Sequence, residues 1–321
     1  MSFSEQLKNE ILKKEYSQSC CKEAILSGFL RCASTLDGVM QAKGVVINGF
    51  EFATESISIR DYFEKIITDI YGNITLKSEY VDAISKKVRY VLSAINSDAV
   101  NLLNKIGIIS QNEKNESNIV LGIDKYVVEN DCCKRAYILG VFLATGYITV
   151  PKKNEKSRTG YHLEFAFSNG VLAKDFCQLL SSLEFIAKST HRKNEIIVYF
   201  NNIEDILSIL NYFKTMKSYF ALEEITIERD IRNDTNRIIN CELSNLNKQV
   251  EASLKHLRCI DQIEKTIGLD SISSQLRSVA IARRENPDST LDELAKILNI
   301  SKSCLNHRLR KIVEIALNLS V

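Results

Sequence analysis

Between residues 290 and 316 apolar residues recur at helical spacing, and the pattern breaks once. The break falls at Asn299, a residue that tolerates the left-handed backbone conformation used in sharp turns. Thr290, with Glu293 three residues later, forms the capping box typical of a helix start, and Ser301 caps a second helix. The pattern therefore predicts two short helices joined by a tight turn. Their apolar faces comprise Leu291, Leu294, Ala295 and Leu298 in the first helix and Leu305, Leu309, Ile312 and Ala316 in the second.

Two helices joined in this way form a helix-turn-helix, in which the second helix lies in the DNA major groove with its N-terminal residues at base edges. The residues expected to contact bases are Ser303, Asn306 and His307, and those expected to contact phosphates are Lys302, Arg308, Arg310 and Lys311. The alternative is a solvated helix face in a small bundle without nucleic acid. The agreement of capping box, small Ala295, turn and basic second helix favours DNA.

The first two-thirds of the chain contains an internal repeat. Residues 20–36, CCKEAILSGFLRCASTL, resemble residues 132–148, CCKRAYILGVFLATGYI, at a constant offset of 112. Such self-similarity predicts a duplicated unit. An opening helix is expected over residues 3–15. The first copy then predicts strands at 38–48 and 53–59, a helix at 60–71, strands at 73–81 and 87–94, and a helix at 97–105. The second predicts strands at 147–150 and 161–167, a helix at 170–182, strands at 185–190 and 195–200, and a helix at 202–213.

Small residues stand four apart on the first helix of each copy: Gly28 and Cys32, then Gly140 and Ala144. Two such helices can pack at short distance. The arrangement resembles the LAGLIDADG homing endonuclease fold, in which two pseudo-symmetric units meet along their motif helices. That resemblance implies an α+β class, a duplicated (αββαββα)2 domain, here followed by an all-α helix-turn-helix domain.

In the endonucleases the motif helix ends in acid, small residue, acid, glycine, and the last acid binds the metal that activates water. This chain has Arg31, Cys32, Ala33 and Ser34 in the first copy and Leu143, Ala144, Thr145 and Gly146 in the second. Without carboxylates a Mg²⁺ ion has no anionic ligand. We therefore expect a nuclease scaffold that has lost its chemistry, with no catalytic residue, metal or cofactor.

Asp37 and Gly38 are the nearest acid–glycine pair. Using them as the motif end would shift Gly28 out of register with Gly140, and Asp-Gly is typical of a turn. An active endonuclease that uses Asp37, Glu51 or Glu164 on the strands is the enzymatic alternative.

The composition does not identify a DNA-binding protein, but it limits where a DNA-binding surface can lie. The net charge is only +2, so affinity for nucleic acid must come from local patches. Residues 271–321 carry eight Lys and Arg against five Asp and Glu, a net +3 from 8 minus 5. The nine cysteines include no C-x-x-C pattern, which favours a reduced, cytoplasmic protein. Neighbouring cysteines on a helix should point in different directions, so Cys20-Cys21 and Cys132-Cys133 are expected to be packed thiols. No apolar run is long enough to span a membrane.

Residues 216–267 are expected to be almost wholly helical. Asparagine is a poor helix former, so its recurrence there needs a reason. Amide contacts to nucleic acid are one reason, and bonds to neighbouring parts of the protein are the other. The candidate face comprises Arg229, Asn233, Asn236, Arg237, Asn240, Asn247 and Lys248.

The chain resembles the WhiA family of bacterial transcriptional regulators over essentially its whole length. Three features carry the resemblance: the two repeats without acids, the segment RNDTNRIINCELSNLNK and the segment SKSCLNHRLRKI. Cys304 departs from the small residue common there. The resemblance implies a cytoplasmic, nucleoid-associated protein that binds double-stranded promoter DNA. It also implies a connection with cell division and chromosome segregation, and with sporulation in some relatives.

The expected domains are a repeat domain at 1–213 (copies about 20–110 and 132–213), a helical linker at 214–268 and a helix-turn-helix domain at 269–321. Another transcription regulator or a division protein is a possible partner. A protein-interaction module with weak nonspecific DNA binding is the main functional alternative.

Overall fold

The computed structural model describes residues 2–41, 44–111, 117–151 and 160–319. The chain divides into two compact units, Met1–Glu228 and Arg229–Val321. Helix α8 (Met216–Thr266) begins in the first unit and ends in the second.

The first unit contains the duplicated arrangement. After α1 (Phe3–Ile11), each copy runs helix, two strands, helix, two strands, helix, as predicted. The first copy comprises α2 (Ser19–Ala33), β1 (Ser34–Gln41), β2 (Gly44–Thr54), α3 (Ile57–Tyr71), β3 (Leu76–Val81), β4 (Val88–Ile95) and α4 (Ser97–Lys105). The second comprises α5 (Asp131–Thr145), β7 (Gly146–Thr149), β8 (His162–Phe167), α6 (Gly170–Ser181), β9 (Lys188–Arg192), β10 (Glu195–Phe200) and α7 (Ile203–Tyr212).

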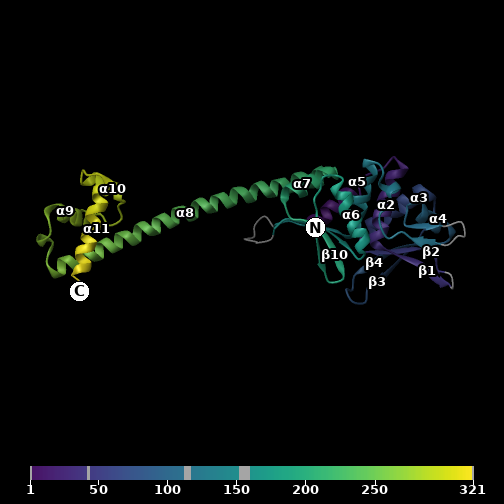
Figure 1. Ribbon diagram of the computed structural model, residues 1–321, viewed down its shortest axis with the longest axis horizontal. Helices are drawn as coiled ribbons and strands as arrows, with labels where there is room; N and C mark the ends of the chain where they lie inside the picture. Colours follow the sequence, from purple (N-terminus) through teal and green to yellow (C-terminus); the bar gives the residue numbers. More distant parts are fainter. Residues whose placement is uncertain (1, 42–43, 112–116, 152–159, 320–321) are drawn as a thin grey trace. The chain divides into compact units, whose positions relative to one another are not determined.

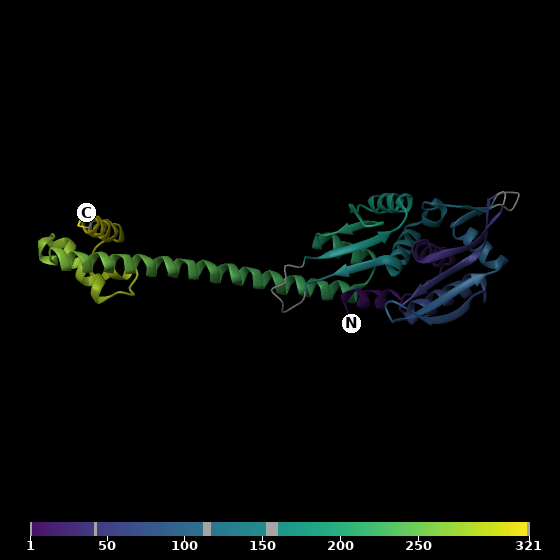
Figure 2. The ribbon, with the colours of Figure 1, turned by 90° about the horizontal axis from the view of Figure 1, so that it is seen from below.

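The two copies build equivalent antiparallel sheets. The strand orders are β1-β2-β4-β3 and β7-β8-β10-β9, so corresponding strands occupy corresponding places. Apolar residues alternate along the strands, as in β8 with Leu163, Phe165 and Phe167 buried, because one sheet face packs on helices. Figures 1 and 2 show the helices of this unit gathered on one face of the sheets. The predicted α+β class and the repeat are confirmed.

Helices α2 and α5 form the centre of this unit and lie side by side (Figure 1). A Cβ atom added to Gly28 would lie 2.3 Å from the carbonyl oxygen of Tyr137, and one added to Gly140 would lie 2.1 Å from that of Ile25. Only glycine allows the two backbones to approach this closely. The prediction of close packing at these two positions is confirmed.

Several predicted boundaries are wrong by a few residues, for local reasons. Only residues 53–54 of the strand expected at 53–59 are extended, as the end of β2, and residues 57–59 are helical, because the Ser56 hydroxyl accepts a hydrogen bond from the Ile59 amide and starts α3. The strand expected at 185–190 extends to Arg192, because Lys193 adopts φ +56° in the following turn. The single strand expected at 38–48 is wrong, because β1 ends at Gln41 and β2 begins at Gly44, and the two strands pair with each other; residues 42–43 lie outside the described residues. The opening helix, expected at 3–15, ends at Ile11.

Four short elements were not predicted from the sequence, and neither was α9. They are β5 (Ile109–Gln111) paired with β6 (Ser117–Ile119), and the 3-10 turns η1 (Lys125–Val128) and η2 (Leu269–Ser271). None of the helices in the described ranges is both long and apolar enough to cross a membrane.

The second unit is all-helical. The end of α8 packs with α9 (Ser274–Glu285), α10 (Leu291–Ile297) and α11 (Lys302–Asn318) around a separate apolar core (Figure 1). Its fully buried residues include Ile260 and Ile263 of α8, Leu294 of α10, and Leu305 and Leu309 of α11. These side chains hold α10 and α11 in a fixed mutual orientation.

Candidate nucleic-acid interface

The first helix of the predicted pair begins with the expected capping box. The Thr290 hydroxyl accepts a hydrogen bond from the Glu293 amide (3.2 Å), and the Glu293 carboxylate accepts one from the Thr290 amide (2.8 Å). These contacts lower the pKa of Glu293 by favouring its charged form. Two amides that helix geometry leaves unpaired are thereby satisfied, and the start of α10 is defined.

The turn between the two helices has the predicted conformation. Asn299 has a φ of +53°, and the Ile300 amide donates a 2.9 Å hydrogen bond to the carbonyl oxygen of Ala295. This bond closes the end of α10 in the manner of a left-handed helix cap. Ala295 is buried, and the Ser301 hydroxyl then accepts a hydrogen bond from the Cys304 amide to start α11.

Helix α11 separates its residues sharply into two faces. Leu305, Leu309, Ile312 and Ala316 are buried, as predicted. At about 100° per residue, the side of the helix opposite this face carries Ser303, His307 and Arg310. All three are exposed. The N-terminal half of α11 therefore presents polar and basic side chains to solvent.

The remaining predicted contacts flank that outward face. Lys302 and Lys311 are exposed, whereas Asn306 and Arg308 are half-buried on opposite sides of the helix. Lys302 Nζ also lies 2.6 Å from a carboxylate oxygen of Asp292 on α10. Because both partners of this ion pair are mostly exposed, the pair is weak and can exchange for a phosphate.

The loop before α10 is held by residues that the sequence did not single out. Arg283 is 2% exposed, and its guanidinium donates hydrogen bonds to the carbonyl oxygens of Ser289 (2.7 Å) and Pro287 (3.4 Å). The Ser253 hydroxyl of α8 donates to the same Pro287 carbonyl. Arg283 thus positions the helix pair from inside. Because Arg283 is buried, one of the eight positive charges counted in residues 271–321 is not available at the surface.

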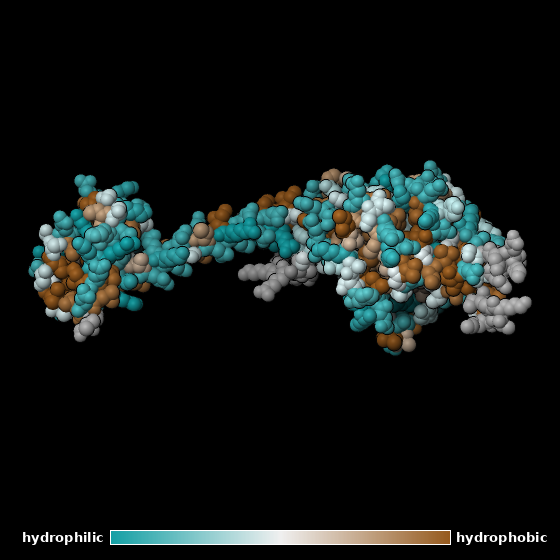
Figure 3. All heavy atoms as spheres, in the orientation of Figure 1, coloured by the Kyte–Doolittle hydropathy of each residue, from teal (hydrophilic) through white to brown (hydrophobic). Residues whose placement is uncertain are grey.

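The asparagines of α8 are exposed to solvent. Asn233, Asn236, Asn240 and Asn247 fall within about 60° of one another around the helix. Figure 3 shows that the middle of α8 is hydrophilic over most of the visible face, with a few apolar side chains. Arg237, on the same side, lies 3.2 Å from Asp234, while Lys248 is exposed and Arg229 half-buried. The row is therefore accessible along its length.

At the positions of the endonuclease acids the structure places no carboxylate, and basic groups lie nearby. The Arg31 guanidinium donates hydrogen bonds to the carbonyl oxygens of Val120 (2.7 Å) and Gly107. Lys8 Nζ donates to the carbonyl oxygen of Leu143 at 3.2 Å, and burial lowers the pKa of Lys8 to about 8. Asp124 and Asp175 lie close enough to interact with Arg31, and Asp175 already accepts a hydrogen bond from the Ile123 amide. A divalent cation at these helix ends would thus meet Arg31 and Lys8 where the nucleases have their motif acids.

The three strand acids considered for an active endonuclease are Asp37, Glu51 and Glu164, and each has a place in the local structure. Glu164 lies 2.9 Å from His162 Nε2 and 2.8 Å from the Arg192 guanidinium. Glu51 is exposed on β2. Asp37 and Gly38 do not form the expected turn; they lie within β1, where the register with β2 shifts. The interpretation of Asp-Gly as a turn was wrong because a β-bulge uses the same residue types.

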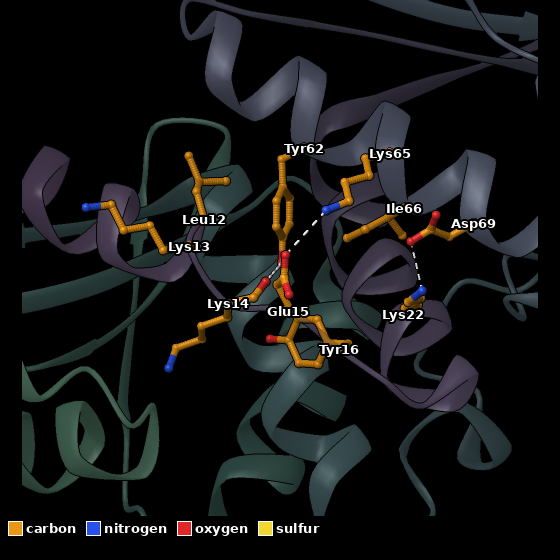
Figure 4. A pocket seen from close by; sticks show the side chains of 10 residues that line it. All are labelled: Leu12, Lys13, Lys14, Glu15, Tyr16, Lys22, Tyr62, Lys65, Ile66 and Asp69. Carbon is orange, nitrogen blue, oxygen red and sulfur yellow. Dashed lines mark hydrogen bonds and ion pairs between the residues drawn. The ribbon is translucent and has the colours of Figure 1, made fainter.

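A pocket of about 400 Å³ lies in the first unit between residues 12–16 and helices α2 and α3 (Figure 4). Lys22 lies 2.8 Å from Asp69, and Lys65 lies 3.5 Å from Glu15. Lys13 and Lys14 also line the pocket, and Lys14 Nζ donates a 2.8 Å hydrogen bond to the carbonyl oxygen of Lys214. Nothing in this lining selects one ligand, and we assign it none.

Comparison with known proteins connects both units to one family. Residues 134–232 match the model of the WhiA LAGLIDADG-like domain, and residues 235–316 match that of the WhiA C-terminal HTH domain. A probable cell division protein WhiA from Alkaliphilus oremlandii is 32% identical, covering 99% of this chain and 98% of the relative. One from Clostridium botulinum is 35% identical, covering 98% of each.

A solved structure shares the fold. The crystal structure of full-length DUF199/WhiA from Thermatoga maritima aligns with a TM-score of 0.57 over 99% of each chain, at 22% sequence identity. The duplicated α+β unit followed by a helical unit is therefore an arrangement already seen in a crystal.

Proposed function

The chain belongs to the WhiA family, and from this premise we propose that it is a transcription regulator that binds promoter DNA through α11. The observation that carries the proposal is the exposed polar and basic face of α11, set beside a capped helix and a tight turn. A helix presented in this way fits the width of the major groove.

The exposed face suggests a division of roles along α11. Ser303, Asn306 and His307 lie in its first two turns and would contact base edges. Lys302, Arg308, Arg310 and Lys311 would contact phosphates, which supply affinity but little sequence information. An asparagine amide can both donate to and accept from one adenine, so Asn306 is the strongest candidate for reading a base.

The second set of contacts that we propose lies on α8. The exposed row Asn233, Asn236, Asn240 and Asn247 offers amides, and Arg229, Arg237 and Lys248 offer positive charge. A nucleic-acid strand along this helix would use both groups.

We also propose that the protein does not cleave DNA. Ala33 and Thr145 stand where the endonucleases carry their metal-binding acids, and Arg31 and Lys8 place positive charge at the same helix ends. A water molecule there has neither a metal site nor a free carboxylate to activate it.

The cellular role we propose follows from the relatives, whose names describe cell division proteins. This chain would act in cell division and chromosome segregation, in the cytoplasm at the nucleoid. We propose a repeat domain at 1–213, a linker at 214–268 and a DNA-binding domain at 269–321. The repeat domain would offer a surface to another regulator or a division protein.

Two substitutions on α11 test the DNA-binding proposal. Asn306→Ala should reduce affinity for the preferred sequence by about five- to 150-fold, from a loss of about 1–3 kcal/mol, with little change on a scrambled duplex. Arg308→Ala should weaken binding to both duplexes and lower the slope of log affinity against log salt by about one. Asn318→Ala, an exposed asparagine at the far end of α11, is the matched control. Equal losses on both duplexes for Asn306→Ala would remove it as a base reader, and unchanged affinity in both variants would refute docking through α11.

A further inference from the structure

Four cysteine thiols converge on one point in the first unit. The Sγ atoms of Cys20, Cys21, Cys132 and Cys133 all lie within 4.8 Å of one another. Cys21 and Cys133 are buried, and Cys20 and Cys132 are partly exposed. The expectation that neighbouring cysteines point in different directions is wrong for these four, whose sulfur atoms converge.

The convergence arises from the pairing of the two repeats. Cys20 and Cys21 are the second and third residues of α2, and Cys132 and Cys133 are the second and third residues of α5. The two helices are drawn together at Gly28 and Gly140, so their first turns meet. Each pair of neighbouring thiols then flanks the same gap between the helices.

The spacing of the sulfur atoms suits a metal ion. A zinc ion bound tetrahedrally to four thiolates has Zn–S bonds of about 2.3 Å, which places the sulfur atoms about 3.8 Å apart. Cys132 Sγ and Cys133 Sγ lie 3.9 Å apart, and the other pairs lie within 4.8 Å. Shifts of less than about 1 Å, available from side-chain rotation, would complete the tetrahedron.

Two helix N-termini and one amide oxygen surround the four thiols. Both helices direct their N-terminal ends at the four thiols, and neither has a side-chain hydrogen bond at its cap. The partial positive charge of a helix N-terminus stabilises a thiolate. The side-chain oxygen of Gln18 accepts hydrogen bonds from the thiols of Cys20, Cys21 and Cys132 at 3.5–3.8 Å. The four sulfur atoms thus already share one polar environment.

We propose that Cys20, Cys21, Cys132 and Cys133 together bind one Zn²⁺ ion, which joins the first turns of the two repeats. Binding forms four Zn–S bonds and breaks four S–H bonds, and the four protons pass to solvent. With four protein ligands the site has no open position, so its role is structural. It lies at the opposite ends of α2 and α5 from the Ala33 and Thr145 positions, and it is independent of the DNA contacts proposed for α11.

Metal analysis of the full-length, untagged chain tests this proposal. Protein produced in zinc-supplemented medium and desalted should contain about one zinc per chain by mass spectrometry. Cobalt added to the zinc-free protein should give the charge-transfer and d–d absorption bands of a tetrahedral tetrathiolate site. Zinc below about a tenth of an equivalent, together with no such cobalt bands, would overturn the proposal.

Variants then locate the metal. Cys20→Ser and Cys132→Ser, at the partly exposed ligands, should lose most of the zinc, whereas Cys177→Ser and Cys241→Ser should retain it. Undiminished zinc in Cys20→Ser and Cys132→Ser would refute the assignment of these ligands.

Thiol alkylation of the zinc-loaded wild-type chain needs no variant. It should modify exposed Cys241 but spare the four ligands until a strong chelator is added. Rapid alkylation of Cys20 and Cys132 before chelation, or disulfides among the four cysteines in freshly purified protein, would contradict a zinc site.

Discussion

Replacing Gly140 with alanine tests the contact on which the pairing of the two repeats depends. In an ordinary exposed helix this change would stabilise the protein by about 1 kcal/mol, because alanine is the better helix former. Here the added Cβ would lie 2.1 Å from the Ile25 carbonyl oxygen and 2.9 Å from the Phe29 amide nitrogen. Both are backbone atoms of α2, so the clash cannot be relieved by rotating a side chain.

The size of the effect follows from these distances. The 2.1 Å contact is 0.9 Å shorter than the 3.0 Å below which real Cβ atoms are essentially never found. Helices α2 and α5 must therefore separate by close to that amount along a fully buried interface. Overpacking of a core costs about 1–3 kcal/mol, and a clash between backbones belongs at the upper end. After subtracting about 1 kcal/mol for helix propensity, we expect a net loss of about 2 kcal/mol.

Thermal unfolding measures this loss. For a unit of this size, about 2 kcal/mol corresponds to a fall in Tm of about 4–8 °C. Gly170→Ala is the control, because a Cβ there meets only Ile196 Cδ1, at an ordinary 3.4 Å. Its Tm should be unchanged or slightly higher. If Gly140→Ala raised the Tm as much as the control did, the close approach of the two helices would be refuted.

Three further results are expected. Thr290→Ala removes the capping hydroxyl of α10 and should destabilise the second unit by about 1 kcal/mol in chemical denaturation, whereas an unchanged midpoint would show that the capping box contributes nothing. Burial, reinforced by Arg283 and Lys255, lowers the pKa of His256 to about 4. Between pH 6.5 and 4 the His256 ring is protonated in the unfolded chain but neutral in the folded chain. The free energy of unfolding should therefore be highest above pH 6.5 and fall as the pH drops from 6.5 towards 4. His256→Gln should make this pH dependence shallower. Replacing Asn236 and Asn240 together with alanine should reduce DNA affinity several-fold in a titration without lowering the Tm, because alanine is the better helix former, and unaltered affinity would exclude these asparagines as contacts.

Local sequence signals were enough to predict the helix pair that forms the candidate interface. The capping box at Thr290, the turn at Asn299 and the apolar stripe of α11 each depend on residues within a few positions of one another. The repeat was also predictable, because the duplicated segment keeps its glycines at one offset. The fold class was implied by the resemblance to the LAGLIDADG fold, which rested on that repeat.

Features that depend on distant contacts could not be predicted in this way. Arg283 resembles its exposed neighbour Arg284 in sequence, and only the packing of α9 against the loop before α10 buries it. The thiol cluster arises where two helix starts, 112 residues apart, are brought together, and a helical projection of either segment alone does not show it. The short β5–β6 pair is similarly determined by tertiary structure rather than by a strong local pattern.

The central claim, sequence-specific DNA binding without cleavage, is tested most directly by recovering bound DNA. Purified protein would be mixed with fragmented genomic DNA from its source organism at physiological salt with Mg²⁺, and both the interiors and the ends of recovered fragments would be sequenced. We expect enrichment around a short shared motif with random ends. Uniform recovery would contradict sequence-specific docking through α11, and recurrent new ends at defined positions would show that the protein cleaves DNA.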